Sequence, residues 1–402
     1  MSKNTDSDAD IDPSESTGEN PLAAVVPKAR TEIAIESLRA EGIYDDRRAV
    51  RSFDDERTAL PVTEPPAETR IDRVVRQVEP TFRPTNLDAM LAERGWSEAE
   101  RARAPGSWAV IGSVVLVTIP SDCPDEGAVA EALLELHGDA ETVLADEGIG
   151  GPFREPRTRH LAGERETETV HVEHGTAYGL DPAAVMFSPG NQAERVRMGR
   201  VVSGSANADL DPVSDSGEVS ATADSAGEGG LDAAERVFDM FAGIGYFTLP
   251  MARAGAHVTA TEANPTAFRY LLENAVRNDV TDRIAAYNAD CRDVARTVDA
   301  DRVVMGYYGI DADEGRDVES QHAEWREQTA ATYLPAALEA VVPGGTVHYH
   351  EAVHEDALWE GPLDRLDRAI EDAGKTFTVD ARRRVKTHSA GVVHVVVDAR
   401  IE

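Results

Sequence analysis

The chain has 402 residues and a formal net charge of −34, because 74 acidic residues outnumber 40 basic ones. This length accommodates two or three domains with their own cores and argues against a single compact domain. Two cysteines are too few for a disulfide framework or a cysteine-rich metal site, and no apolar run approaches the length of a membrane span. We therefore expect a cytoplasmic protein without a membrane segment, a signal peptide or a bound metal.

The excess of acidic residues is better evidence for a salt-rich environment than for the kind of partner that the protein binds. Almost every cation is an arginine, since lysine occurs only at positions 3, 28, 375 and 386. In molar salt the Debye length is about 3 Å, so surface carboxylates repel one another little and keep the protein hydrated. We interpret the composition as halophilic and expect activity to depend on high salt. A polyanion would then need local arginine clusters, for which the candidates are Arg154, Arg157, Arg159, Arg195, Arg197 and Arg200.

The N-terminal part divides into a tail and a small module. Residues 1–22 are rich in Ser, Asp, Glu and Asn, and they contain too few large apolar side chains to offset the entropy of ordering. We expect them to form a disordered acidic tail. A helix over 31–41 followed by polar strand-and-turn material predicts a small N-terminal module over 30–66.

A smaller α+β middle domain is expected over 85–200. Its last part, 187–197, is typical of a turn that leads into a helix with one Glu and two Arg. The earlier elements expected in this domain are a helical stretch over 86–103, a buried strand pair over 108–119, a helix over 126–137, and strands over 169–173 and 184–187.

Residues 201–230 are mostly Ser, Ala, Asp, Glu and Gly, which is the composition of a flexible linker. We interpret this stretch as a low-complexity acidic insertion. Its deletion is predicted to leave activity intact, and a folded deletion variant without activity would contradict this.

The most informative stretch is Arg236-Val-Phe-Asp-Met-Phe-Ala-Gly-Ile-Gly-Tyr-Phe-Thr-Leu-Pro250. An apolar strand leads into a Gly-x-Gly turn and then an apolar helix, as in Rossmann-type sheets that bind nucleotide-like cofactors. Gly243 and Gly245 lack a Cβ, so the backbone can turn tightly and approach a ligand. Thr248 stands where a third glycine would serve a pyrophosphate, which argues against NAD and favours S-adenosylmethionine.

Two later strand ends carry acids at informative positions. Glu262 follows the second strand at the spacing expected of a residue that binds both ribose hydroxyls. Asp290 follows a third strand over 284–287, which places it at the adenine edge. Alone, a Gly-x-Gly is often an ordinary turn and a Glu after a strand is usually solvated. The combination makes those simpler interpretations improbable.

A fourth strand over 301–305 ends at Gly306-Tyr-Tyr-Gly309, which should face the substrate. Four βα units in succession predict an α/β fold, the Rossmann-like class I methyltransferase fold, for a catalytic domain over 231–402. Its later elements are expected at 341–351 as a helix end, turn and strand, and at 377–381 and 392–399 as strands.

Five motifs together resemble the archaeal and eukaryotic enzymes that modify the purine immediately 3′ of the tRNA anticodon. The resemblance covers roughly residue 30 to the C-terminus without the insertion, and it implies S-adenosylmethionine as cofactor and tRNA as partner. The motifs are Arg159-His-Leu-Ala-Gly163, Phe187-Ser-Pro-Gly-Asn191, Asp239-Met-Phe-Ala-Gly-Ile-Gly245, Glu262-Ala-Asn-Pro265 and Asp301-Arg-Val-Val-Met305.

That family has two branches. In the guanine N1-methyltransferases the fourth strand ends in Asn-Leu-Pro or a close variant, whereas this chain has Gly306-Tyr-Tyr308. The segments His348-Tyr-His-Glu351 and Ser389-Ala-Gly-Val-Val-His-Val-Val-Val-Asp398 also look like the aminocarboxypropyltransferase branch. The resemblance implies transfer of the 3-amino-3-carboxypropyl group to carbon 7 of 4-demethylwyosine at position 37 of tRNA(Phe), in wyosine biosynthesis. Methylthioadenosine would be released, the anticodon stem-loop would be the partner, and a monomer is expected.

The resemblance also implies that Ser188 and Arg195 reach the cofactor. A guanidinium engages both oxygens of a carboxylate, so Arg195 is suited to the amino-acid arm. On spacing alone, an arginine paired with Glu194 or with phosphate is the more ordinary interpretation. The full set of expected cofactor-binding residues is Ser188, Arg195, Phe241, Gly243, Gly245, Glu262, Asp290 and Cys291.

Several roles stay open at this point. The proton acceptor is unassigned: Asp290, His350 and Glu351 stand at strand ends, and the last two are equally consistent with a structural role. Tyr307 and Tyr308 would either stack on a flipped base or pack beneath a loop. Two other functions are alternatives, a guanine N1-methyltransferase and a non-catalytic RNA-binding module with a methyltransferase fold.

Overall fold

The computed structural model describes residues 9–10, 21–77, 86–151, 153–204, 234–307, 330–389 and 391–402. They fall into two compact units. One unit lies within Met1–Ala104 and Asp122–His137, and the other within Pro105–Ser121 and Gly138–Glu402. Tyr308 and nearly all of the expected insertion lie outside the described residues.

The first unit contains a five-stranded antiparallel sheet in the order β1-β5-β2-β4-β3, with α1 packed on it. Its central strand β2 is an apolar run whose residues alternate between two cores: Ala24 and Val26 face α1, while Ala23 and Val25 face the opposite side. The elements are β1 (Ala9–Asp10), β2 (Leu22–Pro27), α1 (Thr31–Ala40), β3 (Arg51–Ser52), β4 (Arg57–Val62) and β5 (Arg73–Arg76).

The expected extent of this module, 30–66, is wrong at both ends. β2 and β5 lie outside that range, yet they pair with each other and complete the sheet. Both faces of β2 are buried, so its sequence lacks the alternation of polar and apolar residues that marks a half-exposed strand. The predicted helix over 31–41 is confirmed by α1.

Helices α2 (Leu87–Glu93), α3 (Glu98–Arg101) and α4 (Glu126–Leu136) complete the first unit. Each begins after a polar residue whose side chain accepts a backbone N–H of the first turn. The single stretch expected over 86–103 is two helices, because Gly95 adopts a positive φ of 87° between them. The helix expected over 126–137 is confirmed. The expected middle domain, 85–200, is thus divided between the two units.

The second unit opens with a four-stranded sheet, β6-β7-β8-β9, and a hairpin, β10-β11. The strand pair over 108–119 and the strand over 169–173 are confirmed. The strand expected over 184–187 is wrong: Asp181 starts a turn, its side chain and carbonyl accepting backbone N–H groups of the next residues. The elements are β6 (Trp108–Ile111), β7 (Val114–Val117), β8 (Thr142–Gly150), β9 (Glu155–Gly163), β10 (Thr169–Glu173) and β11 (Thr176–Leu180).

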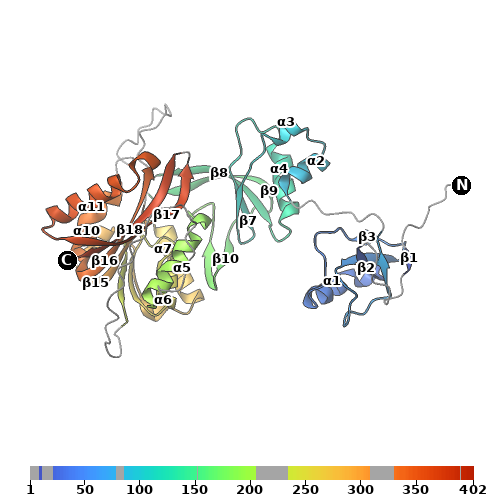
Figure 1. Cartoon of the computed structure of the whole chain (residues 1–402), viewed down its shortest axis with the longest axis horizontal. Coiled ribbons are helices and arrows are strands. Elements are labelled where there is room, and N and C mark those ends of the chain that lie inside the picture. The colour runs from blue at the N-terminus through green and yellow to red at the C-terminus, as the bar shows by residue number, and fades with distance from the viewer. Residues whose placement is uncertain are drawn as a thin grey trace. The chain divides into compact units, whose positions relative to one another are not determined.

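A seven-stranded sheet in the order β14-β13-β12-β15-β16-β18-β17 forms the rest of the second unit (Figure 1). Strands β14, β13, β12, β15 and β16 pair in parallel, and β18 lies antiparallel between β16 and β17. This is the predicted Rossmann-like class I methyltransferase topology. The strands are β12 (Arg236–Asp239), β13 (His257–Thr261), β14 (Ile284–Tyr287), β15 (Ala300–Met305), β16 (Val341–His354), β17 (Phe377–Ser389) and β18 (Val392–Ile401).

Helices cover both faces of this sheet. On one face Leu249 and Leu271 pack with Val237 of β12, and on the other Leu334 packs with the neighbouring Phe238. Adjacent strand residues therefore serve opposite cores. The first face carries α5 (Gln192–Val202), α6 (Thr248–Arg253) and α7 (Pro265–Arg277); the second carries α8 (Cys291–Ala295), α10 (Leu334–Ala340) and α11 (Glu360–Asp372).

The β10-β11 hairpin is fixed to α7 by two asparagines. Asn274 accepts the Gly179 N–H at 2.7 Å and donates to the Gly179 carbonyl at 3.0 Å, and Asn278 makes the same pair of bonds to Ala177. Two side-chain amides thus substitute for a neighbouring strand. Among the described residues no helix is long and apolar enough to cross a membrane.

Candidate functional site

A cavity opens where β12, β13, β14 and β15 end, beside the point at which the strand order reverses. In open α/β sheets this is where ligands bind. Of the eight residues expected to bind the cofactor, seven line it, all except Gly245. The lining residues are Phe153, Arg154, Met186, Ser188, Asn191, Arg195, Met240, Phe241, Gly243, Ile244, Tyr246, Phe247, Glu262, Ala263, Asn264, Ala267, Ala289, Asp290, Cys291, Gly306, Tyr307 and Tyr333.

The two glycines of the turn have different tasks. Gly243 has a φ of 57° and lines the cavity, and a Cβ there would lie 2.5 Å from the ring of Tyr246. Gly245 has a φ of 105°, and a Cβ would lie 2.7 Å from Leu249 of α6. Gly245 therefore allows the helix to pack close to the turn, and the expectation that it contacts the cofactor is not supported by its position.

Asp239 ties the turn to α6 from beneath. This fully buried carboxyl group accepts the Thr248 hydroxyl at 2.6 Å and the Phe241 N–H at 3.4 Å. Burial raises its pKa to about 6, although both hydrogen bonds act in the opposite direction. Thr248, which replaces the third glycine of the dinucleotide pattern, thus has a structural task here.

Glu262 faces the turn from the end of β13. Its two carboxylate oxygens accept the Gly243 N–H at 2.8 Å and the Asn264 N–H at 2.7 Å. Burial raises the pKa of this carboxyl group, and the nearby Asp239 adds to the effect. A carboxylate that is held by neutral amides and lines a cavity retains lone pairs for a further donor such as a ribose hydroxyl.

Asp290 and Cys291 form the far side of the cavity at the start of α8. Asp290 accepts the Arg292 N–H and forms an ion pair with the same residue at 2.6 Å, which lowers the pKa of the carboxyl group. Burial raises the pKa of the Cys291 thiol to about 12, so the thiol stays protonated. A protonated thiol is a weak nucleophile and packs as a small apolar group at the cavity wall.

Three aromatic rings meet at the cavity. Phe241 lies 5.0 Å from Tyr307 and 4.9 Å from Tyr333, between ring centroids. The guanidinium of Arg154, from the turn between β8 and β9, lies 5.3 Å from the centroid of Tyr307. Tyr307 thus lines the cavity and is in contact with other rings at once, so both of its predicted roles are compatible with its position.

Ser188 and Arg195 reach the cavity from the loop before α5 and from α5 itself. Arg195 is only 2% exposed, and its Nε and Nη2 each donate at 2.8 Å to the carboxylate of Glu173. Its Nη1 donates to the Ser188 carbonyl at 3.0 Å. Glu173 occupies the Nε–Nη2 edge of the guanidinium, so this edge is not open to a cofactor carboxylate, and the alternative pairing with Glu194 is not seen. Glu173 lies on β10, and no local spacing links it to Arg195.

Family models match two parts of the chain. The TYW2 N-terminal domain matches residues 87–167, and the TRM5/TYW2 methyltransferase domain matches residues 169–211 and 229–313. A relative from Pyrococcus horikoshii, named tRNA(Phe) (4-demethylwyosine(37)-C(7)) aminocarboxypropyltransferase, is 35% identical over 299 residues, 74% of this chain and 90% of the relative. The chain belongs to the TRM5/TYW2 family.

Two further comparisons place the chain within that family. The tRNA (guanine(37)-N(1))-methyltransferase Trm5b of Pyrococcus abyssi is 26% identical over 299 residues, which are 74% of this chain and 75% of the relative. The crystal structure of P. horikoshii TYW2 in complex with MeSAdo matches with a TM-score of 0.57 and 31% identity, over 78% of this chain and 97% of that chain. The predicted family and fold are both confirmed.

His350 and Glu351, two open candidates for the proton acceptor, do not line the cavity of this family member. His350 is buried in β16, with its Nδ1 3.1 Å from His394 Nε2, and its ring contacts Phe247, which lines the cavity. Glu351 points to the other face and pairs with Arg365 of α11 at 2.6 Å. Of the three candidates, only Asp290 lines the cavity.

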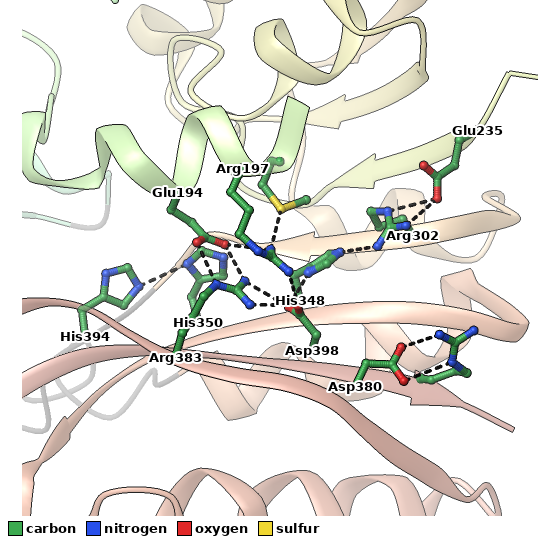
Figure 2. A network of polar contacts seen from close by, with 12 residues as sticks. Glu194, Arg197, Glu235, Arg302, His348, His350, Asp380, Arg383, His394 and Asp398 are labelled. Atoms are coloured by element: carbon green, nitrogen blue, oxygen red, sulfur yellow. Dashed lines mark hydrogen bonds and ion pairs between the residues drawn. The ribbon is translucent and has the colours of Figure 1, made fainter. Parts of the chain in front are cut away.

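A buried charge network joins α5 to the antiparallel part of the sheet (Figure 2). Arg383 of β17 pairs with Glu194 at 2.6 Å and with Asp398 of β18 at 2.9 Å. Asp398 also contacts Arg197 and accepts from His348 Nδ1 at 2.6 Å, and the contacts with His348 and Arg383 hold the pKa of Asp398 well below its usual value against the effect of burial. Arg195 and Arg197 are therefore occupied within the protein, which argues against their expected role in holding phosphate.

Sequence reasoning missed several residues of the cavity. Asn191, Asn264, Tyr246 and Tyr333 all line it, although none was assigned to the cofactor. Asn264 begins α7 by accepting the Thr266 N–H at 2.9 Å, and Asn-Pro after a strand is a recognisable helix start that points to it. Within the described ranges no group of three or more metal-ligating side chains could hold a metal ion.

Proposed function

We propose that this chain transfers the 3-amino-3-carboxypropyl group of S-adenosylmethionine to carbon 7 of 4-demethylwyosine at position 37 of tRNA(Phe), releasing methylthioadenosine. The observation that carries the proposal is the 35% identity to the P. horikoshii aminocarboxypropyltransferase over 90% of that relative. The match to a TYW2 N-terminal domain and the likeness to TYW2 in complex with MeSAdo support it.

The cavity offers a distinct place to each end of the cofactor. Glu262 is positioned for the two ribose hydroxyls, because its carboxylate lines the cavity beside the Gly243 turn. The wall formed by Asp290 and Cys291 is assigned to adenine, with the carboxylate near its amino edge. The amino-acid arm then extends toward Ser188. The first two roles are the ones expected of residues that follow the ends of neighbouring parallel strands.

The reaction is a displacement at carbon. Carbon 7 of the base attacks the terminal arm carbon that is bonded to sulfur, the carbon–sulfur bond breaks, and its electron pair converts the sulfonium into a neutral thioether. The base then loses its proton from carbon 7. Which carbon of the sulfonium reacts depends on which one lies in line with the nucleophile, so orientation of the arm selects transfer of the arm over transfer of the methyl group.

We assign the anticodon stem-loop as the RNA element that is bound, and a cytoplasmic monomer as the active form. Because the chain carries a net charge of −34, we expect transfer to require molar salt, where carboxylate repulsion is screened. Full activity in dilute buffer would contradict this part of the proposal.

The by-product of one turnover tests the proposed function. The protein is incubated in molar KCl with S-adenosylmethionine and tRNA(Phe) that carries 4-demethylwyosine, and the released nucleoside is separated by chromatography. Methylthioadenosine is the expected product. S-adenosylhomocysteine would instead favour guanine N1-methyl transfer, which the 26% identity to Trm5b keeps as the second candidate. The absence of both, with cofactor bound, would favour a non-catalytic module.

A further inference from the structure

Lys386 is bound to a residue of the cavity although it lies on a distant strand. Its Nζ donates to the Ser188 hydroxyl oxygen at 2.6 Å, a contact between residues 198 positions apart. The chain uses arginine for almost every cation, and the three residues 382–384 just before this position in β17 are arginines. The choice of lysine over arginine at position 386 therefore needs a physical explanation.

The backbone around both residues is arranged for this contact. The register of β17 against β18 shifts between Arg384 and Lys386, and such a bulge redirects a side chain. The lysine stem then crosses Gly190, where a Cβ would lie 3.1 Å from Lys386 Cδ. The missing side chain at Gly190 leaves room for the slim stem of a lysine, whereas a broader guanidinium would need more space.

The contact determines what the hydroxyl can do. An ammonium group only donates hydrogen bonds, so the Ser188 oxygen acts as the acceptor and its own hydrogen points away from Lys386. The Ser188 carbonyl is held separately by Arg195 Nη1 at 3.0 Å. The Lys386 ammonium takes one lone pair of the hydroxyl oxygen, so the hydroxyl hydrogen is free to be donated toward the cavity that Ser188 lines.

We propose that Lys386 is a positioning residue that makes the Ser188 hydroxyl a hydrogen-bond donor to the carboxylate of the amino-acid arm. The inference rests on the proposed use of S-adenosylmethionine and names the anchor that orients its arm. The carboxylate is the matching end of the arm, because the ammonium end would need an acceptor and would lie beside a second positive charge. Arg195 supports the same anchor through the Ser188 carbonyl.

The test compares two ligands that differ only in the arm. Binding of S-adenosylmethionine and of methylthioadenosine is measured by calorimetry in molar KCl, without tRNA, for the wild type and Lys386→Met. We expect about tenfold weaker binding of S-adenosylmethionine, the size of one hydrogen bond to a charged group, and methylthioadenosine affinity unchanged within about twofold. Arg384→Met is the matched control, since it removes a charge from the same strand at an exposed pair with Glu355. It should change neither affinity.

A double variant separates action through Ser188 from direct contact. In a Ser188→Ala background, Lys386→Met should have no further effect on either ligand. Equal weakening of both ligands by Lys386→Met would mean a merely structural role, and additive effects in the double variant would mean that Lys386 itself contacts the arm. Each of these results would overturn the proposal. The assay needs no transfer, so failure of the proposed reaction and failure of this inference are distinguishable.

Discussion

The cavity and the buried charge network are both rich in ionisable side chains, but they use them in opposite ways. In the network, each carboxylate is matched by cations, as Asp398 is by Arg383 and Arg197. In the cavity, Glu262 is held by two backbone amides, and its pKa is raised by burial. Matched charges hold α5 on the sheet, whereas the partly buried carboxylate of Glu262, held only by neutral groups, can accept a further hydrogen bond from a ligand. One region thus serves stability and the other binding.

Removing one charge from the network should have the largest effect on stability. Asp398→Asn leaves Arg197 and Arg383 to share the single carboxylate of Glu194, so one buried positive charge loses its match and the free energy of unfolding should fall by about 3–5 kcal/mol. Denaturant unfolding in molar salt measures this. The affinity of the remaining folded protein for S-adenosylmethionine should stay within about twofold.

Asp380→Asn is the matched control for that experiment. Asp380 pairs with Arg400 at 2.7 Å on the same sheet, but this pair is partly exposed, so its loss should cost less than about 1 kcal/mol. In Figure 2 the Asp380 pair stands apart from the buried cluster. Equal destabilisation by the two substitutions would remove the distinction between matched burial and surface pairing.

Glu262→Gln in the cavity should have the opposite result, a loss of affinity with little loss of stability. It replaces one of the two acceptor oxygens, so S-adenosylmethionine should bind about 50-fold more weakly, while the free energy of unfolding changes by less than about 1 kcal/mol. Calorimetry and denaturant unfolding on the same samples give both numbers. Glu273→Gln, on the exposed side of α7, is the control. Unchanged affinity in Glu262→Gln would refute the ribose assignment.

Acid should weaken cofactor binding through the same residue. The raised pKa of Glu262 means that the carboxylate, which accepts hydrogen bonds, is lost by protonation at a pH above its ordinary value of 4.5. As the pH falls below that pKa, affinity for S-adenosylmethionine should drop about tenfold per pH unit, because only the ionised form binds. Calorimetry across the range in which circular dichroism is constant tests this. The dependence should be absent in Glu262→Gln.

A smaller effect is expected at His350, which sequence reasoning left open as a base. Burial lowers its pKa well below 6.5, and the residue does not line the cavity. His350→Gln should therefore leave the transfer rate within about threefold, once its stability is matched by salt. A folded variant that had lost transfer a hundredfold or more would identify His350 as part of the reaction.

The smallest effect is expected from deletion of residues 212–228, which the methyltransferase family model passes over. This stretch lies outside the described residues and within the predicted insertion. Because α5 is fixed to the sheet by its own ion pairs, transfer should stay within about twofold of the full chain in a turnover assay. An inactive but folded deletion variant would show that the insertion contributes to the site.

The fold and the cavity are predictable from sequence where the signal is local. Gly243, Glu262 and Asp290 each follow a strand of one parallel sheet, so the rule that strand ends share an edge brings them together. Glu173 and Lys386 are different. They reach Arg195 and Ser188 from a hairpin and from an antiparallel strand whose register no spacing in the sequence encodes.

Sequence reasoning did not predict the charge network or the face of β16 on which His350 lies, again because local spacing does not encode long-range pairing. Glu194 and Arg383 are 189 positions apart, and alternation along β16 alone does not say which face meets the cavity. The turn at Asp181 was missed because a short apolar run after it is equally typical of a strand. Pairing between residues far apart in the sequence determines the charge network and the position of His350, whereas the turn at Asp181 is local.

The central claim is that the cavity delivers the amino-acid arm of the cofactor and not its methyl group. The most direct test is mass spectrometry of tRNA(Phe) carrying 4-demethylwyosine, after incubation in molar KCl with cofactor labelled separately in the methyl group and in the arm. Arm label at position 37 of the tRNA, without methyl label, is the predicted result. Methyl label in guanosine 37 of unmodified tRNA, with no arm label in either substrate, would contradict the account.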